Sequence, residues 1–496
     1  MNKKLIILLC SLICVFVVFY FVFINNKKKV NNTNNNAVSS NVVEKITYED
    51  KSVDFSKYTE TNVDLDSEKE VYNITSGGVY HITGELNGYI KVDTEDDVKI
   101  ILDNATITND NGPCIYGVNS NNIYIEIIGE NTLTDGKTYT GFEEEVTSAI
   151  FSNDDLIFSG TGSLVINANY NDGISSDDDI EFVNGTYTIK SVDDGIRGKD
   201  SVVITSGIFT IESNGDGIKS TNDTESDKGY ILIKNGTFNI NSSNDAIDAS
   251  TNVEIDNGDF NIKTSSTDAD SSAKGIKANN NILIKKGNID IDSSDDAIHS
   301  NNTIEIDNGK ITITSDDDGI HADSLVVIND GTININAHEG IEATYVKING
   351  GTININASDD GINAAKKSTD YTPTVEINGG NITIKMGSGD TDGIDSNGNI
   401  YVNGGTINIT GQSAFDYDGE AKNNGGTIII NGETTNTITN QMMGGKGGMN
   451  NSRNAQMNGN MPNSDRMRNN DMNQTDQGMR PDMSTNGGRR NGRGRM

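Results

Sequence analysis

The stretch Ile348-Asn-Gly-Gly-Thr-Ile-Asn-Ile355 decides the fold, because close copies of it recur along the chain. Three of the copies are Phe182-Val-Asn-Gly-Thr-Tyr-Thr-Ile189, Ile233-Lys-Asn-Gly-Thr-Phe-Asn-Ile240 and Ile328-Asn-Asp-Gly-Thr-Ile-Asn-Ile335. Each is a short β-branched run broken by Gly, and apolar and polar residues alternate after the Gly as they do in a half-buried strand. The matching glycines run from Gly160 to Gly426, and their commonest spacing is 22 residues. The pattern predicts strands that recur once in every such unit.

A second motif, an acidic residue followed by Gly or Ala and then Ile, occurs in most of these units. Its acidic members are Asp172, Asp194, Asp216, Asp245, Asp296, Asp318, Glu339, Asp360 and Asp392. A unit with two or three short strands cannot bury a core alone, so successive units must stack. A leucine-rich repeat has a similar period, but only nine Leu lie between residues 45 and 440, and neither its frame nor that of calcium β-rolls appears. We therefore predict an all-β fold, a right-handed parallel β-helix over residues 68–440.

The two ends of the chain differ from the repeat in composition. The run Leu5–Ile24 is apolar apart from Ser11 and is flanked by lysines, which suits a membrane-spanning helix. No small-residue cleavage site follows it, so we expect an uncleaved signal anchor over residues 1–29 rather than a removed signal peptide. Residues 30–67 are expected to form a linker and N-terminal cap. Residues 441–496, rich in Met, Asn, Gly and Arg, are expected to form a disordered tail.

The formal charge of −34 is distributed unevenly along the chain. Residues 1–40 and 441–496 each carry +5, which leaves −44 on the body between them. An acidic body repels phosphates, so we expect no nucleic-acid partner. The one Cys outside the apolar N-terminal run, Cys114, is expected to be a small buried hydrophobe. We place the body at the cell surface, on the extracellular face of the membrane, as a monomer; cleavage of the N-terminal segment would make it secreted.

In a stack of coils, the acidic motif becomes a vertical row of carboxylates, which we call the acid ladder. Two carboxylates about 4.8 Å apart repel by about 3.5 kcal/mol at an effective dielectric near 20. A hard cation with oxygen ligands, calcium above all, would relieve that repulsion. The predicted calcium ligands are Asp172, Asp193, Asp194, Asp216, Asp245, Asp248, Asp296, Asp318 and Asp360. The alternative is that each Asp-Gly is only a solvated turn.

The residue after the Ile of each motif points away from the core, since strand residues alternate. This outer column reads Ser175, Arg197, Lys219, Asp248, Lys277, His299, His321, Glu342, Asn363 and Asp395. The expected carbohydrate contacts are Arg197, Lys219, Lys277, His299 and His321, because calcium and a few bases together could hold an acidic polymer. The two histidines and the Glu after them could alternatively ligate zinc or iron. The absence of Trp gives no support to a flat aromatic platform.

Several blocks of the sequence resemble one protein family. They are Gly78-Val-Tyr-His-Ile-Thr-Gly84, Ile101-Leu-Asp-Asn-Ala105, Glu130-Asn-Thr-Leu-Thr-Asp-Gly136, Asp193-Asp-Gly-Ile-Arg-Gly-Lys-Asp200 and Gly215-Asp-Gly-Ile-Lys-Ser220. Over roughly residues 68–440 the chain is similar to the calcium-binding, polysaccharide-lyase-like β-helix carbohydrate-binding proteins of clostridia and related Gram-positive bacteria. The resemblance implies a right-handed parallel β-helix, bound calcium, and binding of plant-wall or other acidic polysaccharide without established cleavage. It supplies no catalytic residues.

Three functions follow as hypotheses. The first is calcium-dependent binding of an acidic polysaccharide at the cell surface, without catalysis. The second is a calcium-dependent lyase of the pectate type. Such an enzyme needs a Lys or Arg that takes the proton α to a uronate carboxylate, and the candidates are Arg197, Lys219 and Lys277. The third is a structural surface spacer or adhesin.

Overall fold

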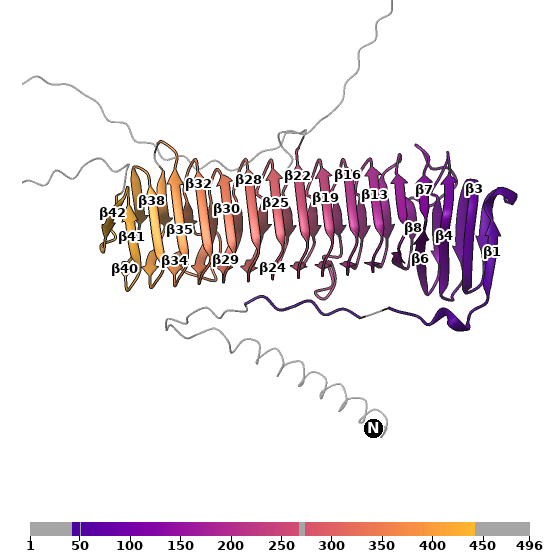
Figure 1. Ribbon diagram of the computed structural model, residues 1–496, viewed down its shortest axis with the longest axis horizontal. Helices are drawn as coiled ribbons and strands as arrows, with labels where there is room; N and C mark the ends of the chain where they lie inside the picture. Colours follow the sequence, from indigo (N-terminus) through magenta and orange to yellow (C-terminus); the bar gives the residue numbers. More distant parts are fainter. Residues whose placement is uncertain (1–41, 50, 267–272, 390, 442–496) are drawn as a thin grey trace, which may run out of the picture. The chain divides into compact units, whose positions relative to one another are not determined.

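The recurring strands of the sequence wind into a parallel β-solenoid (Figure 1). The computed structural model describes residues 42–49, 51–266, 273–389 and 391–441. All 42 strands in these ranges join one continuous sheet, and only the terminal pair, β41 (Thr427–Ile430) with β42 (Glu433–Thr435), is antiparallel. The described residues contain two short 3-10 helices, η1 (Phe55–Lys57) and η2 (Leu65–Ser67), and no α-helix. The prediction of an all-β parallel solenoid is confirmed, and its right-handed sense stays a prediction.

Each regular coil contributes one strand to each of three faces, which we call C, B and A in chain order. The first strands, which start the stack, are β1 (Glu60–Asp64), β2 (Glu70–Ile74), β3 (Gly78–Asp93) and β4 (Val98–Thr108). Face C consists of β5 (Ile115–Asn119), β8 (Ser148–Ser152), β11 (Asp172–Ser176), β14 (Ile196–Gly198), β17 (Ile218–Ser220), β20 (Ile247–Ala249), β23 (Ile276–Ala278), β26 (Ile298–Ser300), the first halves of β29 (Ile320–Ile328) and β31 (Ile341–Ile348), β33 (Ile362–Ala364), β36 (Asp392–Ser396) and β39 (Ser413–Tyr417).

The other two faces follow the same order along the stack. Face B consists of β6 (Asn122–Ile128), β9 (Asp155–Gly160), β12 (Asp179–Phe182), β15 (Ser201–Ile204), β18 (Tyr230–Ile233), β21 (Asn252–Ile255), β24 (Asn281–Ile284), β27 (Thr303–Ile306), the second halves of β29 and β31, β34 (Thr374–Ile377), β37 (Asn399–Val402) and β40 (Ala421–Asn423). Face A consists of β7 (Glu130–Thr134), β10 (Ser163–Asn167), β13 (Thr186–Ser191), β16 (Ile208–Ser213), β19 (Thr237–Ser242), β22 (Asp259–Thr264), β25 (Asn288–Ser293), β28 (Lys310–Ser315), β30 (Thr332–Ala337), β32 (Thr352–Ala357), β35 (Asn381–Met386), β38 (Thr406–Thr410) and β41.

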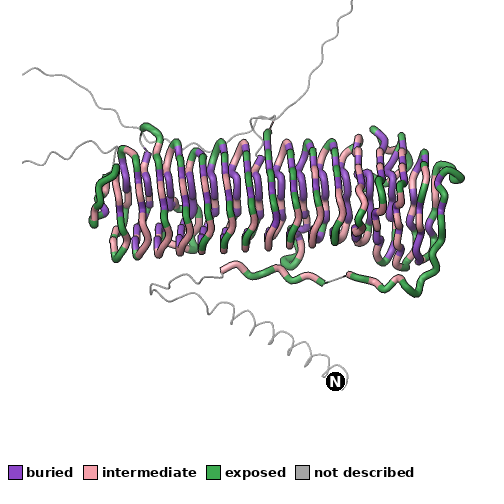
Figure 2. The backbone as a smooth tube through the Cα atoms, viewed as in Figure 1, coloured by how far each residue is buried: buried purple, intermediate pink, exposed green. Residues whose placement is uncertain are grey.

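Columns of apolar side chains fill the inside of the stack. Buried and exposed residues alternate along the strands, as the colours of Figure 2 show. The Ile of the acidic motif has no exposed surface in any coil from Ile174 to Ile394. On face A, the rings of Phe209, Phe238 and Phe260 stack with centroids 5.1 and 4.6 Å apart. Burial of each such side chain contributes about 1.5–3 kcal/mol, so the repeating core is the main source of stability. Cys114 is a free, buried thiol, as predicted.

The repeating glycines are required by backbone and packing together. Twelve glycines, from Gly160 to Gly426, occupy the matching position, and eleven of them have φ between +77° and +147°, a region that L side chains rarely adopt. At Gly236, an added Cβ would lie 2.8 Å from the Phe238 ring and 3.1 Å from the carbonyl oxygen of Gly207 in the coil before. A side chain at this position would therefore clash with the aromatic ring and with the preceding coil. This explains why Gly recurs at the same place in successive coils.

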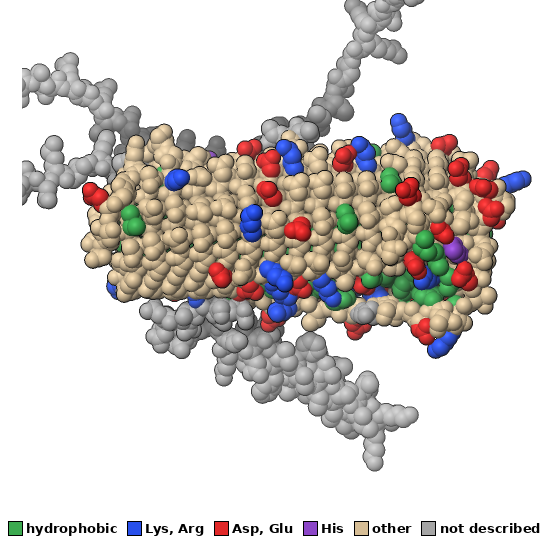
Figure 3. All heavy atoms as spheres, viewed as in Figure 1, with side chains coloured by type: hydrophobic (Ala, Val, Ile, Leu, Met, Phe, Trp, Pro, Cys, Tyr) green, Lys and Arg blue, Asp and Glu red, His purple; other side chains and the backbone are tan. Residues whose placement is uncertain are grey.

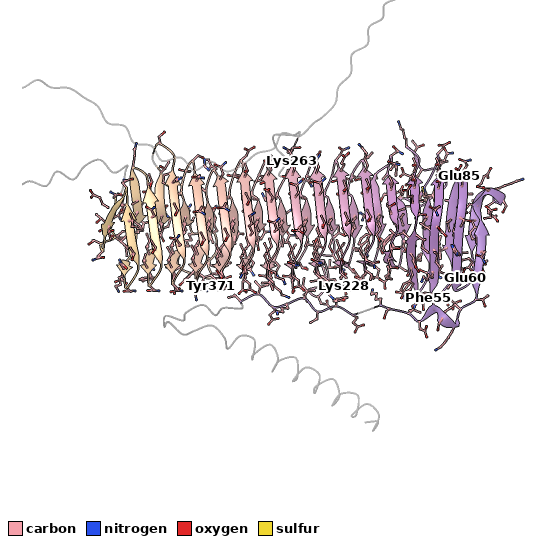
Figure 4. All side chains as sticks on the ribbon, viewed as in Figure 1. Phe55, Glu60, Glu85, Lys228, Lys263 and Tyr371 are labelled. Carbon is pink, nitrogen blue, oxygen red and sulfur yellow. The ribbon has the colours of Figure 1, made fainter. Side chains whose placement is uncertain are left out.

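Residues 42–49 and 51–58 lie against the solenoid, and we call them the strap. The backbone N–H groups of Val42 and Val43 donate to Oε2 of Glu305, at 2.7 and 2.9 Å. Further along, Lys51 pairs with Asp155 and Asp179. Figure 4 labels Phe55, which belongs to the strap, and Lys228, at the edge of the solenoid along which the strap runs. The solenoid begins at β1, directly after the strap.

Face A presents mainly uncharged polar groups to solvent, and acids and bases are scattered over the side seen in Figure 3. Asn261 donates to Asn239 of the preceding coil at 2.8 Å, one of several asparagine pairs between coils. Within the part of the chain that the structure describes, no helix has the length and hydropathy needed to cross a bilayer. The predicted signal anchor over residues 1–29, and the predicted tail beyond Gln441, lie outside the described residues.

Candidate functional site

The outer column of face C has the alignment expected from the sequence. In the sheet register Ser175 pairs with Arg197, and Arg197 with Lys219. The same register continues coil by coil through His299 and His321, as far as Asp395 and then Asp416. Face C therefore carries one continuous strip of ionisable side chains, at about 4.8 Å per coil.

The acid ladder beside this column is buried and takes part in the structure of the coil. Asp172, Asp194 and Asp216 are at most 5% exposed. Oδ1 of Asp172 accepts the backbone N–H of Asp194 at 3.2 Å, and Oδ1 of Asp194 accepts that of Asp216 at 2.8 Å. The next bond, from the N–H of Asp245 to Oδ1 of Asp216, is 2.9 Å long. Each carboxylate therefore satisfies a backbone donor of the following coil, a structural role that the sequence analysis did not anticipate.

The bases of the outer column neutralise the central part of the acid ladder. Nε of Arg197 lies 3.0 Å from Oδ2 of Asp172. Nζ of Lys219 lies 2.5 Å from Oδ2 of Asp216 and 3.6 Å from that of Asp194. Lys277 pairs in the same way, at 2.8 Å from Asp245 and 3.3 Å from Asp248. The chain thus supplies counter-ions to carboxylates for which the sequence alone suggested calcium.

Lys274 interrupts the ladder and completes this pattern. Its backbone N–H donates to Oδ1 of Asp245 at 2.7 Å, as the acid of a regular coil would. Its amine reaches the following coil, 2.7 Å from Asp295 and 3.4 Å from Asp296. Where the acidic motif is interrupted, the chain therefore places a positive charge beside the carboxylates of the next coil.

The electrostatics of the central ladder reflect this pairing. Burial alone would lower the pKa of Lys219, but Asp216 and Asp194 outweigh it and hold that pKa above its ordinary value. Burial, with Asp216 and Asp172 close by, raises the pKa of Asp194 to about 7, and Lys219 opposes that rise only in part. Lys219 is consequently a permanent cation at neutral pH.

Three of the predicted calcium ligands come together in space. Asp172, Asp193 and Asp194 each offer a carboxylate oxygen within 4.8 Å of the others. Gly215 of the next coil lies against this group, because an added Cβ there would be 2.2 Å from Oδ1 of Asp193 and 2.6 Å from Oδ1 of Asp194. The donor set is all oxygen, which fits calcium.

The C-terminal part of the ladder has no such supply of bases. Among the described residues, no Lys, Arg or His forms an ion pair with Asp360, Asp395 or Asp416. Burial, followed by repulsion from Asp360, Asp416 and Asp392, raises the pKa of Asp395 to about 7. Burial and the neighbouring acids likewise raise the pKa of Asp360 to about 6. Lys367 pairs with Glu342 of the coil before at 2.7 Å, so among the described residues it is these three aspartates that have no basic partner.

A buried amide oxygen lies in the same region. Asn363 is 9% exposed, and its Nδ2 donates to Oε2 of Glu339 and Oε1 of Glu342, each at 3.0 Å. These two bonds fix the orientation of the amide, and its Oδ1 has no hydrogen-bond partner. Asp395 is the residue next to Asn363 in the register. A buried carbonyl oxygen without a donor, one coil from Asp395, is the kind of uncharged oxygen ligand that calcium accepts.

An aromatic cluster continues the outer column toward the N-terminal end of face C. Phe151 pairs in register with Ser175, and Tyr116 with Phe151. Nearby, Tyr139 and Tyr170 stack with ring centroids 4.3 Å apart, and Tyr170 is 39% exposed. The sequence analysis missed this cluster, although extending the outer column back from Ser175 by one coil would have reached Phe151.

Known proteins were compared with the whole chain. A family model described as "Carbohydrate-binding domain-containing protein" matches residues 68–319 and 316–465. A carbohydrate-binding domain-containing protein of Acetivibrio thermocellus is 35% identical over 162 residues, which are 31% of this chain and 55% of that relative. The match therefore spans about half the length of that relative.

A solved structure was also found, titled "Structure of the polysaccharide lyase-like protein from C. thermocellum, Gadolinium derivative". It is 30% identical, with a TM-score of 0.40, over 46% of this chain and 96% of that one. The family model covers most of the body and both halves of the solenoid. The chain belongs to the family of carbohydrate-binding domain-containing proteins.

Proposed function

We propose that the protein binds an acidic polysaccharide along face C, with the help of calcium, on the outer surface of the cell. The observation that carries the proposal is the continuous strip on this face, which begins beside the exposed ring of Tyr170 and ends at Asp416. A strip that repeats once per coil suits an extended polymer whose units repeat along one direction. Aromatic rings and charged side chains are the groups that bind sugar rings and sugar acids.

Two places on the strip fit calcium by their ligands, and the first lies near its N-terminal end. It is the trio Asp172, Asp193 and Asp194, whose carboxylate oxygens lie close enough to share one ion. Calcium bound there would supply positive charge to a carboxylate of the polymer. The residues of the chain would position the ion and limit its exposure to water.

The second place lies toward the C-terminal end of the strip. It combines the carboxylates of Asp360 and Asp395 with an uncharged oxygen, Oδ1 of Asn363. Calcium accepts both kinds of oxygen ligand, and its charge would relieve the repulsion that raises the pKa values of the two acids. This group is the better candidate for an ion that the polymer shares, because no base of the described chain pairs with its carboxylates.

The central bases serve this binding mode better than they serve a lyase. Arg197, Lys219 and Lys277 are each engaged with buried carboxylates. Burial favours the neutral form of Lys277, but Asp245 and Asp248 outweigh it and raise its pKa. A general base must lose its proton near neutral pH, and a raised pKa opposes that loss. Binding without cleavage is therefore the function that we propose.

The test is retention of the purified full-length chain in gels that contain polygalacturonate or, as a control, a neutral β-glucan. We expect polygalacturonate to retard the protein in calcium and much less in chelator. The double variant Asp360→Asn with Asp395→Asn should lose most of the calcium effect. Asp290→Asn, an exposed acid on face A, is the matched control and should keep it.

Other results would overturn the proposal. Retention that chelator does not change would rule out the calcium part. No retention by either polymer would leave the spacer or adhesin hypothesis. A calcium-dependent rise in the absorbance of unsaturated uronate product, lost in Lys219→Ala, would show a lyase. Protease treatment of intact cells should cleave the body if it lies at the outer surface.

A further inference from the structure

His299 and His321 form a cluster with carboxylates that differs in chemistry from the rest of face C. The two rings come from successive coils, and their centroids are 4.9 Å apart. Asp296, His299 and His321 each offer one ligand atom within 4.8 Å of the others, and Asp318 and Glu342 extend the group. In three of the four coils just before His299, Arg or Lys occupies the same column, so imidazole nitrogens replace permanent cations here.

The ligand atoms lie close enough together to converge on one metal ion. Nδ1 of His299 lies 2.7 Å from Oδ2 of Asp296, and Nδ1 of His321 lies 3.6 Å from the same oxygen. Nδ1 of His321 lies 2.9 Å from Oδ2 of Asp318. Tetrahedral zinc with bonds of about 2.0–2.1 Å holds its ligand atoms about 3.3–3.4 Å apart. To reach that spacing around one ion, the two shorter contacts would lengthen by about 0.4–0.7 Å and the longest would shorten by about 0.2–0.3 Å.

The other ring nitrogens fix which atoms face the cluster. Nε2 of His299 lies 2.9 Å from Oδ1 of Asn301, an acceptor, so this nitrogen carries the proton. In the neutral ring, the lone pair of Nδ1 then points at Asp296, which is repulsive unless a cation lies between them. A ligating histidine usually has this kind of support from an acceptor on its second nitrogen.

His321, in the next coil, also turns Nδ1 toward a carboxylate, but its second ring nitrogen differs from that of His299. Its side chain is 13% exposed, and Nε2 is buried without a hydrogen-bond partner. The groups nearest Nε2 are acceptors as well, Glu342 at 3.6 Å and Asp323 at 3.8 Å. Both rings therefore present Nδ1 to carboxylates, and a shared cation would satisfy both.

We propose that Asp296, His299, His321 and Asp318 bind a divalent transition metal of the zinc class. Two imidazolium ions with rings 4.9 Å apart would repel each other, whereas one dication serves both nitrogens and both carboxylates. Two nitrogen and two carboxylate ligands suit zinc, while calcium prefers oxygen alone. The site is independent of the calcium-dependent binding proposed above.

The test uses the full-length chain with calcium in excess, so that hard-cation sites are filled. Calorimetric titration with Zn²⁺ should give one site whose affinity falls at least about 10- to 100-fold in His299→Gln and in His321→Ala, since even outer-shell changes cost that much. Co²⁺ bound to the unmodified chain should show the intense visible absorption of a tetrahedral ion, a readout that needs no variant.

The matched control is His81→Ala. His81 also lies between two carboxylates, 3.2 Å from Glu60 and 3.0 Å from Asp103, but has no second histidine beside it among the described residues. This variant should bind Zn²⁺ as the unmodified chain does. Equal binding by all variants, an octahedral Co²⁺ spectrum, or no binding would overturn the proposal and leave the two histidines as ion-pair partners only.

Discussion

The central and C-terminal parts of face C have the same backbone, but they differ in whether basic side chains pair with their aspartates. In the centre, Arg197, Lys219 and Lys277 each neutralise buried aspartates. Toward the C-terminal end, Asp360 and Asp395 have no such partner among the described residues, and burial with neighbouring acids raises their pKa values to about 6 and 7. Asp360 still accepts the backbone N–H of Asp392 at 2.8 Å, so the two parts differ in their basic partners and not in the role of the carboxylate in the coil.

The largest loss of stability is expected when an aspartate of the central part of face C is removed. Asp216 has no exposed surface, caps the N–H of Asp245 and pairs with Lys219. Asp216→Ala leaves the N–H of Asp245 without its acceptor and removes the closer of the two carboxylates that pair with Lys219, so we expect a loss of about 3–5 kcal/mol in the free energy of unfolding. Denaturant unfolding followed by circular dichroism measures it.

The double variant Asp216→Asn with Lys219→Met is the control for this change. It keeps an acceptor for the N–H of Asp245 and removes both charges, so most of the lost stability should return. A loss in the double variant as large as that in Asp216→Ala would show that charge pairing is not what stabilises these coils.

A smaller change in stability is expected when calcium binds the C-terminal part of face C. If calcium binds there, about 100 times its dissociation constant should stabilise the chain by about 2.7 kcal/mol. Asp360→Asn with Asp395→Asn should abolish most of that gain, and Asp290→Asn should not. Melting temperatures with calcium and with chelator measure it, and an unchanged gain in the double variant would place calcium elsewhere.

The pH dependence of the melting temperature, measured in chelator, tests the same C-terminal aspartates without calcium. A carboxyl group whose pKa is raised by folding binds protons in the folded chain that the unfolded chain releases, so its contribution to stability is lost as pH rises through the folded value. Asp360 and Asp395 have pKa values of about 6 and 7, so melting temperature should fall between about pH 5 and about pH 8. Replacing both by Asn should flatten the curve, and a slope that stays the same would contradict the assignment.

The smallest effect is expected on face A. Lys263 and Asp292 pair at 3.0 Å, but their side chains are 60% and 57% exposed. Solvent screens such a pair, so Lys263→Ala should change the free energy of unfolding by less than about 1 kcal/mol. A loss comparable to that of Asp216→Ala would mean that burial is not what distinguishes the central pairs.

The coil could be predicted from the sequence because its causes are local. The Gly of all but one unit has a backbone conformation that other residues rarely adopt, and the Ile of each acidic motif is buried in one column. Spacing alone therefore predicted the register, including the alignment of Arg197 with Lys219. The family resemblance is also confirmed by the match to the family model.

The chemistry of the ladder was harder to predict, because it depends on how side chains reach between coils. The spacing placed Lys219 beside the acids, but not its pairing with Asp216 or the use of Oδ1 of Asp216 as a backbone acceptor. The aromatic cluster at Tyr170 was missed because its members come from an irregular stretch before the regular motif begins. Calcium binding stays a prediction.

The strap has a consequence for how the solenoid comes apart. Coils in a stack touch only their neighbours, so a solenoid can fray from either end one coil at a time. The strap links Val42 to Glu305, residues 263 apart in sequence, and also joins Lys51 to Asp155 and Asp179. Opening the first coils while the strap stays bound strains these distant contacts. Slow hydrogen exchange should therefore extend to β1 and β3, which would otherwise be the first strands to open.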